Sequence, residues 1–179
     1  IKNGKIIDTN RIDKIIPILE YLIKNKSKII IISHIGRPKG KIVKELSLEP
    51  VSLFIKEKIK KEIYLLKENI FELNKQKIFE CFKTGIIMLE NIRFYHEEEA
   101  NDEKFSKKLA SFGEIYVNDA FSCSHRNHAS ISNITKYIPS YCGIQINAEV
   151  NALKKITSEI KKPITCIIGG SKISSKIAI

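Results

Sequence analysis

The sequence predicts a three-layer α/β protein, in which helices cover both faces of a parallel sheet. Short runs of isoleucine, leucine and valine alternate along the chain with longer amphipathic segments, an order typical of strands and helices in such a sheet. The apolar runs are continuous, so the strands are expected to be buried on both faces. Hydrophobic residues make up 43% of the 179 residues, enough to fill the core of one such domain.

Ten segments have the periodicity of a helix or a strand, and turn residues separate them. In chain order they are a helix over 13–26, a strand over 29–32, a helix over 48–61, a strand over 63–66, a helix over 71–82, a strand over 86–89, a helix over 101–113, a strand over 114–117, a helix over 147–161 and a strand over 164–168. Pro17 lies where a first helical turn tolerates it, and Gly85 and Pro163 mark breaks. Asn101 is expected to cap the fourth helix, and Gly113 to end it. This pattern is typical of a Rossmann-like fold.

The sequence has no feature of a membrane or secreted protein. No apolar run approaches the roughly 18–20 residues that span a bilayer, and the N-terminal segment has no signal-peptide pattern. A soluble, cytoplasmic protein is therefore expected. The sequence begins without methionine and ends within a helix-like pattern, so we expect it to be a fragment.

Neither a metal site nor covalent catalysis is predicted from the cysteines and histidines. No C-x-x-C pair occurs among the four cysteines, so buried free thiols are expected. The cysteines are Cys81, Cys123, Cys142 and Cys166. His125 and His128 have no acidic or thiol partner at the spacing of a metal site. Ser122 lies near His125, but nothing in the sequence places a base beside it.

The strongest compositional feature is a formal net charge of +11 at pH 7, with an isoelectric point of about 9.4. Twenty-seven of the 31 basic residues are lysine, and they are scattered among glutamates as on solvated helix faces. A general drift toward lysine would explain this charge without any partner. The alternative is an anionic partner, namely nucleic acid, a membrane surface or a phosphorylated metabolite.

Arginine is rare in this chain, and its positions favour an anion site. The four arginines are Arg11, Arg37, Arg93 and Arg126. The last three lie in or just after loops that follow predicted strands, where open parallel sheets bind ligands, and the first opens the helix before the first strand. His34 and His125 lie near two of them. Because a guanidinium group binds phosphate or carboxylate oxygens in pairs, we expect these side chains to hold a small metabolite that carries both groups.

Other polar segments carry little functional signal by themselves. The acidic run 97–99 is expected to be a solvated segment before a helix, and the neighbouring His96 to be a surface residue. The segment GGSK at 169–172 lacks the spacing of a Walker loop, so alone it is weak support for nucleotide binding.

Five segments resemble motifs of the phosphoglycerate kinase family, in the order and at the spacing of that family. They are NGKIIDTNRI at 3–12, SHIGRP at 33–38, LENIRFYHEEE at 89–99, YVNDAF followed by SHRNHAS at 116–130, and GGSKISSK at 169–176. One such segment would be weak, but five in order are specific. The chain is therefore identified as a member of this family over essentially all of its length.

The resemblance implies most of the N-terminal lobe of a two-lobed kinase. Such an enzyme transfers a phosphoryl group reversibly between 1,3-bisphosphoglycerate and ADP, giving 3-phosphoglycerate and ATP in glycolysis. By resemblance, residues 1–146 form the substrate lobe, 147–162 the interdomain helix and 163–179 the start of the nucleotide lobe. A monomer is implied, with Mg²⁺ carried by ADP or ATP and with neither nucleic acid nor membrane as a partner.

The resemblance also assigns roles to residues. The substrate-binding positions of the family match Arg11, His34, Arg37, Arg93 and Arg126. Arg11 and Lys172 are implied to act on the phosphoryl group in transfer, and Gly170, Lys172 and Lys176 to bind the nucleotide. The family's first strand and most of its nucleotide lobe are missing from the sequence, so the chain alone is expected to hold mainly the phosphoglycerate site without catalysing transfer.

Two other classes of function stay open. Nucleic-acid binding is disfavoured because the charge is dispersed and the arginines lie in separate loops, not along one helix. A module that binds a phosphorylated acid without turnover is the second class. Activity of the full-length protein would distinguish it from a kinase.

Overall fold

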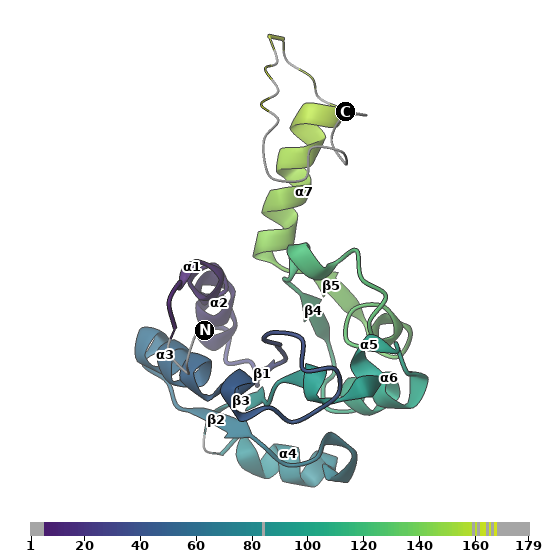
Figure 1. Ribbon diagram of the computed structural model, residues 1–179. Helices are drawn as coiled ribbons and strands as arrows, with labels where there is room; N and C mark the ends of the chain where they lie inside the picture. The colour runs from purple at the N-terminus through teal and green to yellow at the C-terminus, as the bar shows by residue number, and fades with distance from the viewer. Residues whose placement is uncertain are drawn as a thin grey trace. The chain divides into compact units, whose positions relative to one another are not determined.

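The central sheet consists of three parallel strands in the order β1-β3-β2. They are β1 (Ile30–Ile31), β2 (Ile63–Leu66) and β3 (Ile86–Leu89), which lie side by side in Figure 1. Ile87 of β3 pairs with Ile30 on one side and with Tyr64 on the other. The structure, a computed structural model, describes residues 6–83 and 85–158, together with residues 160, 162, 163, 165 and 167.

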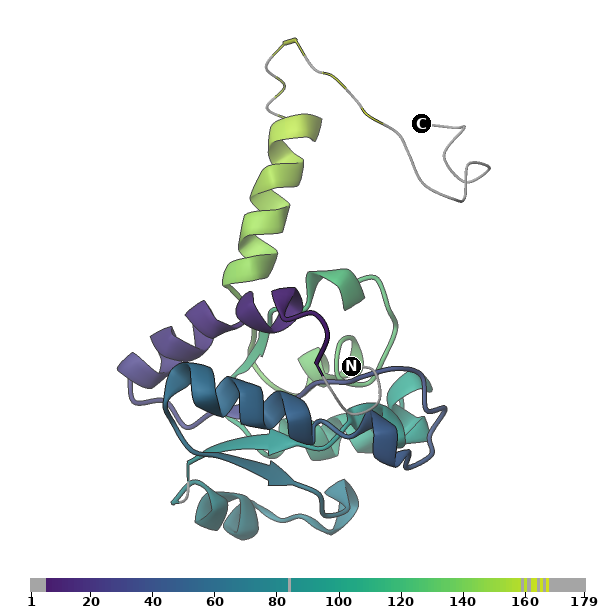
Figure 2. The same ribbon diagram turned by 60° about the vertical axis from the view of Figure 1, so that its left-hand side comes forward.

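Helices surround this sheet and connect its strands. The α-helices of the described residues are α1 (Asn10–Asp13), α2 (Ile16–Lys24), α3 (Glu49–Ile59), α4 (Lys75–Cys81), α5 (His96–Glu99), α6 (Glu103–Ala110) and α7 (Ile144–Thr157). The 3-10 helices are η1 (Lys44–Leu46), η2 (Ile70–Glu72), η3 (Ile92–Phe94), η4 (Phe121–Cys123) and η5 (Asn133–Lys136). In Figure 2 the sheet lies between α3 on one side and α4 on the other.

Successive residues of β3 point to opposite faces of the sheet, and both faces are covered. Met88 belongs to one hydrophobic core, together with Leu19 of α2 and Ile55 of α3. Ile87 belongs to the other core, together with Phe105 of α6. The predicted three-layer α/β fold class is therefore confirmed.

A second sheet contains two parallel strands, β4 (Tyr116–Asn118) and β5 (Ser140–Cys142). Val117 pairs with Tyr141 in this sheet. No strand was predicted at β5, because its sequence, Ser-Tyr-Cys, is not an apolar run. In the structure its three residues are exposed. The pairing with β4, and not the local sequence, makes this segment a strand.

Two predicted helices are interrupted. The helix expected over 13–26 is divided into α1 and α2, and Pro17 lies in the first turn of α2 as predicted. The helix expected over 71–82 is divided into η2 and α4. Between them Leu73 is buried, and the Asn74 side chain accepts a hydrogen bond from the backbone N–H of Lys77 (2.8 Å). This cap starts α4 four residues later than the apolar pattern suggested.

The prediction that Asn101 caps the fourth helix is wrong by one residue. Asp102 is the cap of α6, because its carboxylate accepts from the backbone N–H of Phe105 (2.7 Å). Asn101 has a φ of +54° and donates to the side chain of Asn127 (2.8 Å). The helix then ends at Ala110, before Gly113. Helix α7 likewise begins three residues before its predicted start at 147, because the Asp119 carboxylate caps it.

The three cysteines among the described residues are free thiols, as expected, but none of them is fully buried. Cys81 and Cys123 are half-buried and Cys142 is exposed on β5, so the expectation of burial is wrong for Cys142 and holds only in part for the other two. Cys166 lies outside the described residues. No helix in the described part of the chain is long and apolar enough to span a membrane.

The chain divides into two units, residues 1–147 and 148–179. The first unit contains both sheets and helices α1 to α6. Helix α7 starts in the first unit and supplies the described helix of the second. Most of the predicted strand at 164–168 lies outside the described residues. The division into a substrate lobe, a connecting helix and a nucleotide lobe stays a prediction.

Candidate anion-binding site

The loop at 33–40, which follows β1, is fixed by the segment that follows β3. Asn91 is fully buried, and its Nδ2 donates to the carbonyl oxygens of Ile35 (2.8 Å) and Leu46 (2.9 Å). Its Oδ1 accepts from the backbone N–H of Arg93 (3.1 Å). One amide side chain therefore joins the loop that carries His34 and Arg37 to the segment that carries Arg93.

Gly36 lets this loop turn tightly. Its φ of +66° lies in the left-handed region, which side chains of L-residues disfavour. A Cβ at this position would lie 2.8 Å from Cδ2 of Leu46. The glycine carbonyl then points at Arg93, whose Nη1 donates to it (3.0 Å).

Arg93 is a buried guanidinium group with two unused donors. Only 3% of the residue is exposed, and among the described residues its Nε and Nη2 have no hydrogen-bond partner. The nearest carboxylate oxygen, Oε1 of Glu99, lies 3.7 Å from Nε, too far for a hydrogen bond. Burial lowers the pKa of Arg93, and the positive charge of Arg126 lowers it further. A buried cation with free N–H groups is costly unless an anion binds it.

Four of the predicted substrate residues lie close enough to influence one another. Burial lowers the pKa of His34 from 6.5 to about 4, and the positive charges of Arg93, Arg126 and Arg11 contribute to the decrease. The imidazole is therefore neutral at pH 7. The charges of these residues, which are far apart in the sequence, thus act on one another, and we refer to His34, Arg11, Arg93 and Arg126 as the basic cluster.

His128 is a further member of this cluster that the sequence prediction missed. It also contributes to the low pKa of His34, and its own pKa is lowered by burial and by Arg93. The sequence did contain a signal, because His128 lies two residues after Arg126 in the same loop.

Arg37 and the predicted nucleotide residues are placed differently. Arg37 is exposed in the loop at 33–40, directly after Gly36. Gly170, Lys172 and Lys176 lie outside the described residues, so their predicted roles are untested. No cluster of three or more histidine, cysteine or acidic residues that could hold a metal ion occurs in the part of the chain that the structure describes.

The expectation that the acidic run 97–99 is solvated is wrong for Glu98, whereas Glu99 is exposed. These residues form most of α5, and Glu98 is only 2% exposed. Its carboxylate accepts from the backbone N–H (2.9 Å) and the hydroxyl (2.7 Å) of Ser130. Burial raises the pKa of Glu98, and these hydrogen bonds partly oppose that increase. His96 is exposed, as expected.

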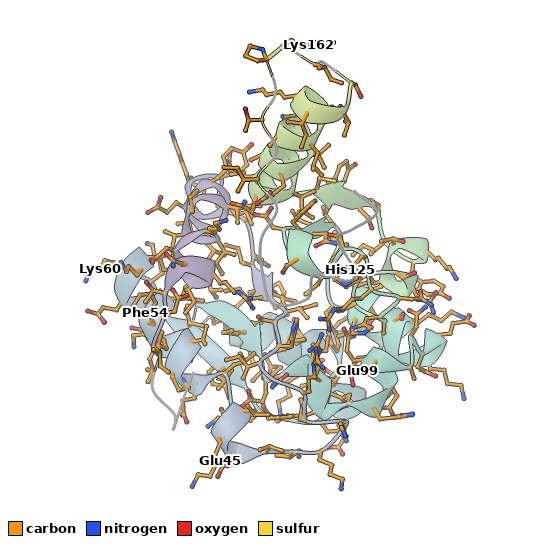
Figure 3. All side chains as sticks on the ribbon, turned by 45° about the horizontal axis from the view of Figure 1, so that its top comes forward. Glu45, Phe54, Lys60, Glu99, His125 and Lys162 are labelled. Carbon is orange, nitrogen blue, oxygen red and sulfur yellow. The ribbon has the colours of Figure 1, made fainter. Side chains whose placement is uncertain are left out.

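A shallow surface hollow lies elsewhere, between α3 and β2. Its lining residues are Leu53, Lys56, Glu57, Lys60, Lys61 and Glu62. In Figure 3 Phe54 and Lys60 mark this side of the molecule, whereas Glu99 and His125 lie on the other. The hollow therefore does not belong to the basic cluster.

The fold and the site define the class of protein: an α/β domain with a basic cluster beside the carboxyl ends of parallel strands. A family model described as phosphoglycerate kinase matches residues 1–179. The chain belongs to the phosphoglycerate kinase family.

Relatives and solved structures agree with this assignment. The phosphoglycerate kinase of Wolbachia pipientis subsp. Culex pipiens (strain wPip) is 48% identical over 177 residues, which are 99% of this chain and 44% of the relative. That of Coprothermobacter proteolyticus is 43% identical over 176 residues, 98% of this chain and 45% of the relative. The structure of phosphoglycerate kinase from Coxiella burnetii has a TM-score of 0.84 and 34% identity, and covers 99% of this chain and 44% of that one. The chain therefore spans slightly less than half the length of these relatives.

Proposed function

We propose that this chain forms the phosphoglycerate site of a phosphoglycerate kinase. The full-length enzyme would transfer a phosphoryl group reversibly between 1,3-bisphosphoglycerate and ADP. The observation that carries the proposal is the buried guanidinium group of Arg93. Two of its nitrogens, Nε and Nη2, have no hydrogen-bond partner among the described residues, and the charge of Arg93 acts on His34 together with that of Arg126. An anionic ligand would provide acceptors for these donors and add to the negative charge of Glu99, which lies too far away for a hydrogen bond.

In this proposal His34, Arg37, Arg93 and Arg126 hold the end of the glycerate that does not react. Paired guanidinium contacts fix the orientation of a phosphate or carboxylate as well as its position. Burial lowers the pKa of His34 and the nearby positive charges lower it further, and a bound anion would offset part of those charges. The neutral imidazole still has one N–H group that can donate to the ligand.

Arg11 and Lys172 are proposed to neutralise the phosphoryl group during transfer. The transition state for such a transfer is loose, with negative charge spread over the moving group, so positioning and charge stabilisation matter more than a strong base. Gly170, Lys172 and Lys176 would bind the nucleotide phosphates, and Mg²⁺ would arrive with ADP or ATP. We further propose a monomeric cytoplasmic enzyme with neither nucleic acid nor membrane as partner.

The proposal is tested by assaying the full-length protein with 3-phosphoglycerate and MgATP. We expect turnover by the unmodified protein. We expect Arg93→Lys to weaken 3-phosphoglycerate binding about tenfold or more, because lysine keeps the positive charge but cannot donate paired hydrogen bonds from one planar group. Lys107→Arg is a matched control, since Lys107 is exposed and pairs with Glu103 on α6. Absence of turnover by the unmodified protein, with binding of 3-phosphoglycerate retained, would favour a binding module without catalysis.

A further inference from the structure

Helix α5 contacts both halves of the basic cluster through two adjacent glutamates. Oε1 of Glu99 lies 3.7 Å from Nε of Arg93, on the side of the cluster that follows β3. Oε1 of Glu98 lies 3.7 Å from Nδ1 of His128, on the side that follows β4. Two consecutive residues on one helical turn point in different directions, so a single turn can reach both sides.

Glu98 is the more strongly anchored of the two. It is 2% exposed, and both of its carboxylate oxygens accept hydrogen bonds from Ser130. Its backbone carbonyl also accepts from the N–H of Ala129 (2.9 Å). Burying a carboxylate is expensive, and its pKa is raised for that reason, so an apolar residue would fill the space at lower cost.

A further hydrogen bond, from Tyr116, holds the same segment. The hydroxyl of Tyr116, on β4, donates to the carbonyl oxygen of Ser130 (2.7 Å). Three atoms of the segment 128–130 thus donate to Glu98, and a fourth, the carbonyl oxygen of Ser130, accepts from Tyr116. Arg126 precedes this segment by two residues, and its backbone N–H donates to the carbonyl oxygen of Cys123 (2.9 Å), so these contacts hold the chain directly after Arg126.

We propose that Glu98 is a positioning residue, which through Ser130 sets Arg126 and His128 against Arg93. Glu98 does not touch the ligand in this role, and it acts by fixing the loop that does. The inference rests on the proposed function, because it assumes that the cluster binds 3-phosphoglycerate. It predicts that loosening the contact weakens substrate binding even where the fold stays intact.

The test uses Ser130→Ala in the full-length protein, because this change removes one hydrogen bond to Glu98 without altering any charge. We expect the KM for 3-phosphoglycerate to rise about fivefold or more, as for the loss of a hydrogen bond to a charged group. The KM for MgATP should stay within about twofold, because the nucleotide is proposed to bind other residues.

Ser52→Ala is the matched control. Ser52 is also a buried serine, 5% exposed, and its hydroxyl donates to the backbone carbonyl of Glu49 (2.8 Å) within α3. It should change Tm as Ser130→Ala does, but leave both KM values unchanged. Tyr116→Phe is a milder second variant. It removes only the hydrogen bond from Tyr116 to the carbonyl oxygen of Ser130, and it should raise the KM for 3-phosphoglycerate by a smaller factor.

Two negative results have different meanings. If Ser130→Ala and Tyr116→Phe lower Tm while the KM for 3-phosphoglycerate stays within twofold of the unmodified protein, Glu98 is only structural and the positioning role is refuted. If the unmodified protein does not bind 3-phosphoglycerate at all, the proposed function fails, and the positioning role fails with it.

Discussion

The loop at 33–40 and the segment at 126–130 both carry predicted substrate residues, but different chemistry holds each of them in place. The first is held by Asn91, a fully buried neutral amide that donates to two backbone carbonyls. The second is held by Glu98, a buried carboxylate that accepts two hydrogen bonds from Ser130. Both Asn91 and Glu98 come from one ten-residue segment, 90–99, which therefore holds both of these loops of the basic cluster.

The difference has a physical consequence. A neutral amide does not titrate in the ordinary pH range, whereas the Glu98 carboxyl does, and the folded state binds its proton more tightly than the unfolded state. The first loop should therefore be rigid across pH, and the second should respond to pH near the pKa of Glu98. The following changes test the difference between the contributions of Asn91 and Glu98.

Loss of the Asn91 side chain should have the largest effect. Asn91→Ala leaves the buried carbonyl groups of Ile35 and Leu46 without their donors, so we expect the free energy of unfolding to fall by about 2–4 kcal/mol. Chemical denaturation measures this change. Asn25→Ala is the control, because Asn25 is exposed and donates only to the carbonyl of Tyr21 (2.8 Å). Similar losses for the two variants would show that the burial of Asn91 does not matter.

Arg37→Lys should weaken 3-phosphoglycerate binding by about 1–3 kcal/mol, because lysine cannot form paired hydrogen bonds with an anion. Arg37 is exposed and next to Gly36, so we expect almost no change in the stability of the fold. Calorimetric titration with 3-phosphoglycerate measures the affinity. An unchanged dissociation constant would remove Arg37 from the proposed site.

Glu98→Gln should remove the part of the pH dependence of the free energy of unfolding that comes from Glu98. The raised pKa means that the folded state holds the Glu98 proton more tightly than the unfolded state does. The stabilising contribution of Glu98 is therefore complete below its ordinary pKa near 4.5, and is lost as the pH rises through the raised value. We expect the advantage of the unmodified protein over the variant to be larger at pH 4 than at pH 7, by about 1.4 kcal/mol for each unit of pKa difference.

Denaturation at the two pH values measures this dependence. Asn91→Ala provides the comparison, because its cost should be the same at both. If the unmodified protein instead exceeds Glu98→Gln in free energy of unfolding by more at pH 7 than at pH 4, the pKa of Glu98 is lowered in the folded state, contrary to the expectation.

The smallest expected effect is a shift in the titration of His34. Without ligand its pKa is about 4, because of burial and the nearby positive charges. A bound phosphate offsets those charges, so saturation with 3-phosphoglycerate should raise this pKa toward its ordinary value near 6.5. NMR of the imidazole ring protons during a pH titration measures the change, with the exposed His96 as an internal reference. A pKa that stays near 4 in the complex would place the ligand away from His34.

Much of the fold could be predicted from local sequence. The apolar runs at 63–66 and 86–89 are strands with the predicted bounds, since continuous isoleucine and leucine favour buried parallel strands. Strand β5 could not be predicted, because only its pairing with β4 defines it. The helix boundaries at Asn74 and Asp102 depended on which of several polar residues reaches a free backbone N–H group.

The sequence alone determined the α/β class, the family and the short set of arginines, because periodicity and motif spacing are properties of the chain itself. Only the tertiary structure decided that Glu98 is buried, that two nitrogens of Arg93 have no hydrogen-bond partner in the described part of the chain and that His128 joins the cluster. The physical reason is that burial and charge repulsion arise between segments that are distant in the sequence, so no local pattern can distinguish Glu98 from the glutamates on either side of it.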